Sequence, residues 1–205
     1  MVHRQFRMRH DLVMTRTVAI LAFDDMEVLD YAGPYEVFNV AGEVTGDFEV
    51  TSVGVTPQPR GRGGFTVIAE HSLDEAPAPD ILIVPGGAGT RRLMRDERVI
   101  TYLTASSASL LLTVCTGALV IAAAGLLDGL EATTHHGAFD ELATASPTTT
   151  IVRDRRFVRS SDRIRTSGGI SAGIDLSLAT VEELAGTGAR ERVETEMEWD
   201  WHRRR

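Results

Sequence analysis

The chain has 205 residues, of which 43% are hydrophobic and 24% charged, and its formal net charge is −8 at pH 7. This length and composition indicate a single globular domain, residues 17–205, which follows a basic, polar arm at residues 1–16 that we expect to be disordered. The negative charge excludes bulk attraction to nucleic acid, and no apolar run reaches the ~18 residues of a membrane helix, so we expect neither partner.

The N-terminal arm has no apolar stretch of the kind found in secretory signals, and Met8 and Met14 are alternative starts of the chain. Cys115 is the single cysteine and has no partner in the chain for a disulfide. This favours a reducing compartment, and we expect a cytoplasmic protein.

Short apolar runs alternate with amphipathic segments along the rest of the chain. Uninterrupted apolar runs are typical of strands buried on both faces, and apolar residues three and four apart are typical of helices. The pattern predicts strands at 17–23, 48–55, 80–87, 109–114, 131–134 and 164–169, and a hairpin at 148–161. It predicts a helix with Pro34 in its first turn, and further helices at 91–106, 117–125, 138–143, 171–186 and 189–199. This alternation indicates an α/β protein with a mostly parallel central sheet and helices on both faces.

Three polar or glycine-rich stretches follow predicted strands. They are "VLDYAGP", "VPGGAG" and "VCTGA", which begin at residues 28, 84 and 114. Ligands of open α/β sheets bind beyond the carboxyl ends of the strands, so these stretches are candidates for a common site.

Cys115 ends an apolar strand and precedes a helix rich in small residues. A lone cysteine often serves as a small apolar core residue, and this interpretation stays open. A residue in a sharp strand-to-helix turn projects above the sheet, as in a nucleophile elbow, and Gly117 and Ala118 allow the helix to pack close to the strand. The start of the helix also favours the thiolate, which is the nucleophilic form. The turn therefore predicts a reactive cysteine.

Four stretches in chain order resemble the PfpI/ThiJ superfamily of class I glutamine amidotransferase-like proteins: "LDYAGPYEVF", "DILIVPGGAGT", "VCTGALVIAAAGLLDG" and "TSGGISAGIDLSL". The set is most similar to the isonitrile hydratase branch, and the resemblance spans about residues 17–199. It implies a flavodoxin-like sandwich, a homodimer and Cys115 as the nucleophile. It also places Asp30 beside the sulfur and the backbone N–H groups of Gly86 and Gly87 toward the site.

Thr116 departs from the peptidase-like members, which are expected to have a histidine after the cysteine. The Cys–His pair is therefore missing, as in the hydratases, and we look to Asp30 for acid–base chemistry, with Thr116 as a further member of the catalytic set. His135 in "ATTHH" is a candidate to approach the site from the next loop, and His136 is expected to be exposed.

Asp30 lies between Leu29 and the "AGP" turn, which predicts partial burial and a raised pKa. The alternative is a helix N-cap ahead of Pro34. Asp175 is expected to cap or orient a helix near the site. Three other acidic residues are expected to form a solvated turn: Asp24, Asp25 and Glu27.

The resemblance implies that the protein adds water to a small-molecule isonitrile without a cofactor. Cys115 attacks the terminal carbon, and Asp30 delivers a proton to that carbon to give a thioimidate. Asp30 then activates water, and an N-substituted formamide is released. Backbone N–H groups of Gly86, Gly87 and Gly117 are expected to stabilise the charge that develops. No CxxC, HExxH or clustered carboxylate pattern suggests a metal.

Two other classes stay open. One is a ligand- or redox-sensing domain without catalysis, similar to the sensor domains of AraC-type regulators, although the predicted domain leaves no room for a helix-turn-helix module. The other is a different cysteine hydrolase or a glyoxalase-like enzyme, which a contact between His135 and the sulfur would favour. Trp199 and Trp201 are expected to serve packing or dimer contacts.

Overall fold

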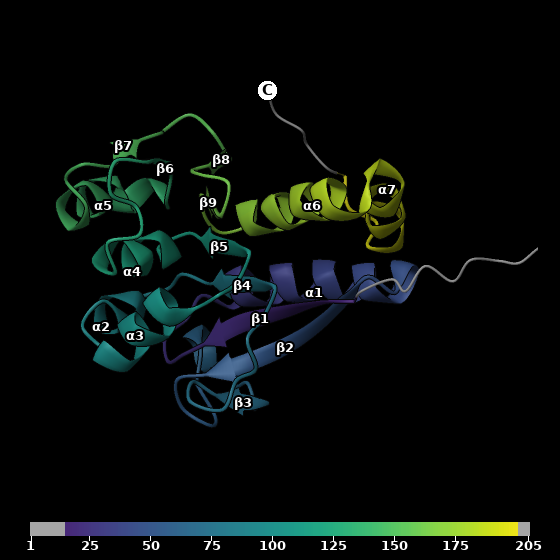
Figure 1. Ribbon diagram of the computed structural model, residues 1–205, viewed down its shortest axis with the longest axis horizontal. Helices are drawn as coiled ribbons and strands as arrows, with labels where there is room; N and C mark the ends of the chain where they lie inside the picture. The colour runs from purple at the N-terminus through teal and green to yellow at the C-terminus, as the bar shows by residue number, and fades with distance from the viewer. Residues whose placement is uncertain (1–14, 201–205) are drawn as a thin grey trace, which may run out of the picture.

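The computed structural model describes residues 15–200. A central sheet of seven strands lies between two groups of helices (Figure 1). The strands of the described residues, of which β6 and β7 lie outside this central sheet, are β1 (Arg16–Ala22), β2 (Phe48–Gly54), β3 (His71–Ser72), β4 (Ile81–Val84), β5 (Leu110–Val114), β6 (Glu131–Ala132), β7 (Thr150–Ile151), β8 (Phe157–Arg159) and β9 (Ile164–Ser167). The helices are α1 (Val28–Thr45), α2 (Thr90–Leu93), α3 (Glu97–Ala105), α4 (Gly117–Ala123), α5 (Phe139–Ala145), α6 (Ala172–Ala185) and α7 (Thr187–Glu196), with 3-10 turns at η1 (Arg62–Gly64) and η2 (His136–Ala138).

The strand order is β3-β2-β1-β4-β5-β9-β8, and every neighbouring pair is parallel except β8 with β9. β6 and β7 form a separate parallel pair. The central strands β4 and β5 are buried along their whole length, because helices cover both faces of the sheet. The predicted α/β class with a mostly parallel sheet is confirmed, and the architecture is flavodoxin-like.

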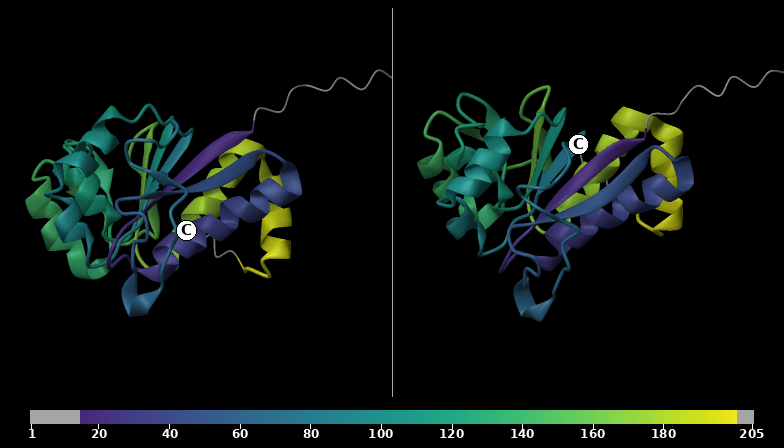
Figure 2. Two further views of the ribbon diagram at one scale, coloured as in Figure 1. Left: turned by 90° about the horizontal axis from the view of Figure 1, so that it is seen from below. Right: turned by 60° about the horizontal axis from the view of Figure 1, so that its bottom comes forward.

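Helices α1, α6 and α7 pack against one another on one face of the sheet, and α2, α3, α4 and α5 lie on the other (Figure 2). Because β1, β4, β5 and β9 are parallel, their carboxyl ends meet at one edge of the sheet. This arrangement brings the three stretches singled out in the sequence together with the segment that follows β9.

The described residues include no helix that is long and apolar enough to cross a membrane. β1 begins at Arg16, so the domain starts one residue earlier than expected. The rest of the proposed arm, up to Met14, lies outside the described residues, as does Trp201.

Two predicted helix boundaries are wrong. α1 begins at Val28, so Pro34 lies inside the helix rather than in its first turn. The buried face formed by Val37, Phe38 and Ala41 outweighs the one backbone hydrogen bond that proline removes. The predicted helix at 91–106 is split in two because the Asp96 carboxylate accepts from the Arg98 N–H at 3.0 Å and caps a new helix, α3.

The predicted hairpin at residues 148–161 does not form. Thr150–Ile151 pairs in parallel with β6, and Phe157–Arg159 pairs antiparallel with β9. Period-two alternation identified two strands correctly, but it carries no information about which strand each one pairs with.

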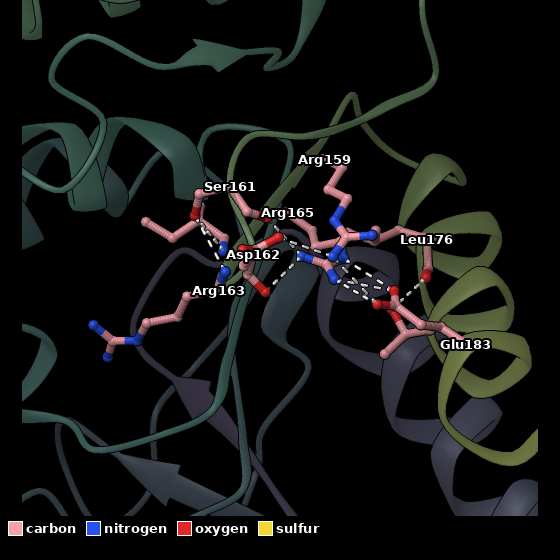
Figure 3. A network of polar contacts seen from close by, with 9 residues as sticks. Arg159, Ser161, Asp162, Arg163, Arg165, Leu176 and Glu183 are labelled. Carbon is pink, nitrogen blue, oxygen red and sulfur yellow. Dashed lines mark hydrogen bonds and ion pairs between the residues drawn. The ribbon is translucent and has the colours of Figure 1, made fainter.

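A buried arginine joins the sheet to α6 (Figure 3). Arg165 on β9 is 4% exposed and forms an ion pair with Glu183 on α6, with Nη2 2.9 Å from Oε1. It also donates to the carbonyl oxygens of Ser161 and Asp162 at 3.0 and 3.3 Å. The guanidinium is therefore satisfied on both sides, and it fixes α6 against the turn between β8 and β9.

Candidate active site

Cys115 occupies the turn between β5 and α4 and has a φ of 56°. Non-glycine residues rarely adopt this left-handed conformation, and such strain is typical of functional sites. The Cys115 N–H donates to the carbonyl oxygens of Ser167 and Gly168, and its own carbonyl accepts from Thr134 Oγ1 at 2.7 Å. Hydrogen bonds from two other segments thus hold the strained residue in place.

The carboxyl group of Asp30 lies against the same turn from the first turn of α1. A Cβ atom at Gly86 would lie 2.7 Å from both Asp30 Oδ2 and Cys115 Cβ, so glycine is required where these residues converge. Asp30 is fully buried, and neither carboxyl oxygen has a hydrogen bond of normal geometry within the described residues. The N-cap of α1 is Glu27, so the alternative interpretation of Asp30 as the cap is wrong.

The pKa of Asp30 is raised to about 7. Burial is the largest cause and the charge of Glu27 acts in the same direction, whereas the nearby Cys115 thiol and the Gly86 N–H lower this pKa in part. Burial also raises the pKa of the Cys115 thiol to about 12, and the Asp30 carboxylate acts in the same direction. The Thr116 backbone N–H at the start of α4 lowers the pKa of the thiol, as expected, but burial and the neighbouring carboxylate outweigh this effect. Between these pKa values the pair shares one proton.

The Thr116 hydroxyl fixes the glycine turn after β4. Thr116 Oγ1 accepts from the Gly87 N–H at 2.9 Å and donates to the Gly87 carbonyl at 3.1 Å. The Gly87 N–H is therefore not free to bind a substrate in this structure. A Cβ atom at Gly117 would lie 2.1 Å from the Val84 carbonyl oxygen, so only glycine fits at this position. It allows α4 to pack close to β4.

His135 lies at the other side of the sulfur. A Cβ atom at Gly169 would lie 2.7 Å from Cys115 Sγ and 3.0 Å from His135 Cδ2, so the thiol and the imidazole face the same glycine. His135 Nδ1 accepts from the Gly137 N–H at 3.1 Å, which places the ring hydrogen on Nε2. Burial and then the neighbouring His136 lower the pKa of His135. His136 is exposed, as predicted.

Glu27 is the residue that sequence reasoning missed. Its side chain is 19% exposed, it forms an ion pair with Arg62 at 2.8 Å, and its charge acts on Asp30. Asp24 and Asp25 are exposed, as predicted for the acidic turn, but Glu27 is not. The available signal was its position three residues before Asp30, which is one turn away on a helix that begins before Pro34.

Asp175 lies away from the sulfur and holds α6 in place. It is 2% exposed, pairs with Arg156 Nε, and accepts from Trp199 Nε1 at 3.4 Å. Arg156 Nη2 also donates to Ser171 at 3.2 Å. The predicted orienting role of Asp175 and the packing role of Trp199 agree with these contacts.

Cavity volume does not identify this site. A cavity of about 570 Å³ lies between α3 and the segment from Leu73 to Pro79. It includes none of the residues that surround Cys115. A cavity of about 260 Å³ includes Gly168 and Gly169, which contact Cys115. Between residues 15 and 200, no group of three or more His, Cys, Asp or Glu side chains is arranged to hold a metal ion.

Known proteins resemble this chain over most of its length. It is 34% identical to the isonitrile hydratase of Pseudomonas putida over 188 residues, which cover 91% of this chain and 79% of that protein. It is 29% identical to the HTH-type transcriptional regulator GbdR of Pseudomonas aeruginosa, over 80% of this chain and 45% of the regulator. A solved ThiJ/PfpI family protein from Pseudomonas syringae superposes with a TM-score of 0.82 at 27% identity, covering 98% of this chain and 82% of that one.

The DJ-1/PfpI family model matches residues 16–183. This range begins with β1, includes the turn at Cys115, and ends within α6. Sequence, fold and site geometry therefore agree, and the chain belongs to the DJ-1/PfpI family.

Proposed function

We propose that this protein is a cysteine-dependent hydratase that converts small isonitriles to N-substituted formamides. The observation that carries this proposal is the pairing of a strained, buried Cys115 with a fully buried Asp30 carboxyl group that has no other partner of normal geometry. An isonitrile carbon accepts both a nucleophile and a proton, and this pair offers both from adjacent atoms. The isonitrile hydratase relative supports the same reaction class.

In the first half of the reaction, the Asp30 carboxylate removes the thiol proton as Cys115 Sγ attacks the terminal carbon. The carbon–sulfur bond forms, and Asp30 returns the proton to that carbon, which gives a thioimidate. A pKa of about 7 suits a carboxyl group that must both accept and donate a proton near neutral pH. Thr116 supports the step by holding the Gly87 turn next to the pair.

In the second half, Asp30 takes a proton from water as the water oxygen attacks the thioimidate carbon, and the nitrogen takes up that proton. The carbon–sulfur bond then breaks, the formamide leaves, and the remaining hydroxyl proton returns to sulfur. One water is consumed, and the Cys115 thiol and the Asp30 carboxylate are regenerated.

Two competing functions receive less support from the geometry. A Cys–His hydrolase needs an imidazole nitrogen free to accept the thiol proton, but Nδ1 of His135 already accepts from Gly137. A redox sensor oxidises through the thiolate, and the raised pKa of Cys115 disfavours that form. The resemblance to regulators is compatible with a sensing domain, and the experiment below separates that role from catalysis.

The test is incubation with a simple alkyl isonitrile, followed by product analysis and mass spectrometry of the intact protein. We expect formamide and a transient adduct on Cys115, no turnover for Cys115→Ala, and turnover reduced by about 10²-fold or more for Asp30→Asn. An unmodified protein with no product supports sensing, and a gain of oxygen mass alone supports a redox role. Formamide production by Cys115→Ala contradicts the proposal.

We further propose a cytoplasmic homodimer. Two exposed apolar side chains flank the site: Leu29 precedes Asp30 and is 40% exposed, and Ile170 follows Gly169 and is 36% exposed. These two side chains are the candidate contacts of the proposed dimer.

A further inference from the structure

A small cavity is lined by residues that contact Cys115. It has a volume of about 260 Å³ and lies between the segment after β6, the segment before β8 and the segment after β9. Three of its lining residues contact Cys115: Thr134 bonds its carbonyl, Gly168 accepts from its N–H, and the Gly169 backbone lies against Sγ. A Cβ atom at Gly169 would lie 2.7 Å from Sγ, so only glycine fits where this cavity approaches the sulfur.

Four consecutive residues of the segment before β8 line this cavity, and the first three of them are exposed: Arg153, Asp154, Arg155 and Arg156. We call it the arginine cavity. Arg156 is neutralised by the buried Asp175 and therefore contributes structure rather than free charge. The charges left to act on a ligand come from Arg153, Asp154 and Arg155.

Neither of the other two arginines is firmly paired. Arg153 lies 4.8 Å from the centre of the Phe139 ring and 3.4 Å from Asp140, whose side chain is 99% exposed, so water screens that pair strongly. Arg155 makes no hydrogen bond or ion pair with any residue between 15 and 200. An unpaired guanidinium next to a cavity offers a planar fork of donors that matches a carboxylate.

We propose that the arginine cavity binds an anionic group of the substrate, with Arg155 as its principal contact. This proposal rests on the hydratase activity proposed above and names its substrate class: a small isonitrile that carries one carboxylate beside an apolar or aromatic body. The Phe139 ring supplies an apolar surface in the same cavity. The local positive charge of these arginines would attract an anion that the net charge of the chain, −8, repels.

Alkylation of Cys115 tests the cavity without relying on turnover. Iodoacetate and iodoacetamide both form a carbon–sulfur bond at the thiolate and release iodide, but only iodoacetate is an anion. The ratio of their two rates cancels the thiolate fraction, so it reports the local charge and not the thiol pKa. We expect Arg155→Gln to lower the iodoacetate-to-iodoacetamide ratio about three- to fivefold at low ionic strength.

Arg192→Gln is the matched control, because Arg192 is an exposed arginine on α7 and does not line the cavity. It removes the same charge and should leave the ratio unchanged. Addition of 0.5 M salt should bring the wild-type ratio toward that of Arg155→Gln. An equal ratio in wild type and Arg155→Gln overturns the proposal.

A kinetic comparison separates this proposal from the reaction itself. For Arg155→Gln, we expect a several-fold higher KM for a carboxylate-bearing isonitrile and an unchanged KM for the neutral isonitrile of the same size. Equal losses for both substrates overturn the anionic substrate class while leaving the hydratase intact. If neither isonitrile is hydrated by wild type but the alkylation ratio falls, the reaction is wrong and the anion site stands.

Discussion

At the scale of single residues, we expect the Asp30 carboxyl group to determine how the proposed activity depends on pH. The reactive pair holds one proton, and this form is populated between the pKa of Asp30, about 7, and that of Cys115, about 12. Below pH 7 a second proton occupies Asp30, which then no longer accepts the thiol proton. We therefore expect kcat/KM for an isonitrile to rise about tenfold per pH unit below pH 7 and to level off above it. A falling profile between pH 7 and 9 contradicts this assignment.

The same group makes stability depend on pH. The folded pKa of Asp30 is raised above its unfolded value of 3.8, so its favourable contribution is fully present below pH 3.8 and is lost as pH rises through 7. The loss at pH 8 is on the order of 4 kcal/mol. We expect Asp30→Asn to remove this loss, measured as a smaller decline in the free energy of unfolding between pH 4 and pH 8. Glu43→Gln, a change at an acidic residue on the same helix far from the sulfur, serves as the control with the wild-type slope.

At the scale of elements, the buried Arg165 links β9 to α6 through its ion pair with Glu183 (Figure 3). Arg165→Met keeps the apolar stem but removes the nearer of the two arginines that pair with Glu183 and leaves two carbonyl oxygens without their donor. We expect it to lower the free energy of unfolding by about 2–3 kcal/mol. Arg159→Met provides the comparison, since its ion pair with Glu183 is longer, 3.8 Å, and more exposed. That change should cost less than about 1 kcal/mol in urea unfolding.

The sequence was sufficient for most elements because apolar periodicity reports burial directly. It predicted the central strands and the strand-to-helix turn at Cys115, where small residues after a strand demand close packing. It was insufficient at Pro34, where tertiary packing of α1 outweighs a local helix signal, and at 148–161, where two strands pair with different partners. The error at Pro34 is also the reason why the role of Glu27 was missed. Only a helix that begins at Val28 places Glu27 one turn from Asp30.

Of the two shifted pKa values at the site, only that of Asp30 could be predicted from the sequence. A raised pKa for Asp30 followed from its apolar neighbours in sequence. The raised pKa of Cys115 did not, because it depends on how deeply the turn is buried and on Asp30, which lies on a different element. The hydrogen bonds of Thr116 to Gly87 likewise join segments that are distant in sequence, and no local pattern encodes them.

At the scale of the whole molecule, the proposed homodimer covers the exposed apolar side chains beside Asp30 and Gly169. We expect sedimentation to give twice the mass of one chain. We expect Leu29→Asp to shift the protein toward monomer, because a charge in an apolar contact is desolvated without a partner. Ile68→Asp introduces the same charge at a residue that is 76% exposed and lies beyond β2, and it should leave the dimer intact. A wild-type monomer contradicts the proposed assembly.

The left-handed backbone at Cys115 has an evolutionary consequence for the whole fold. Glycine adopts a φ of 56° without strain, so Cys115→Gly gains about 1 kcal/mol of backbone relief that offsets the loss of a small buried side chain. Cysteine and glycine codons differ by a single base. Loss of the proposed nucleophile is therefore one mutation away and carries little folding penalty. This gives a simple route by which an enzyme of this architecture becomes a domain that binds its former substrate and no longer consumes it.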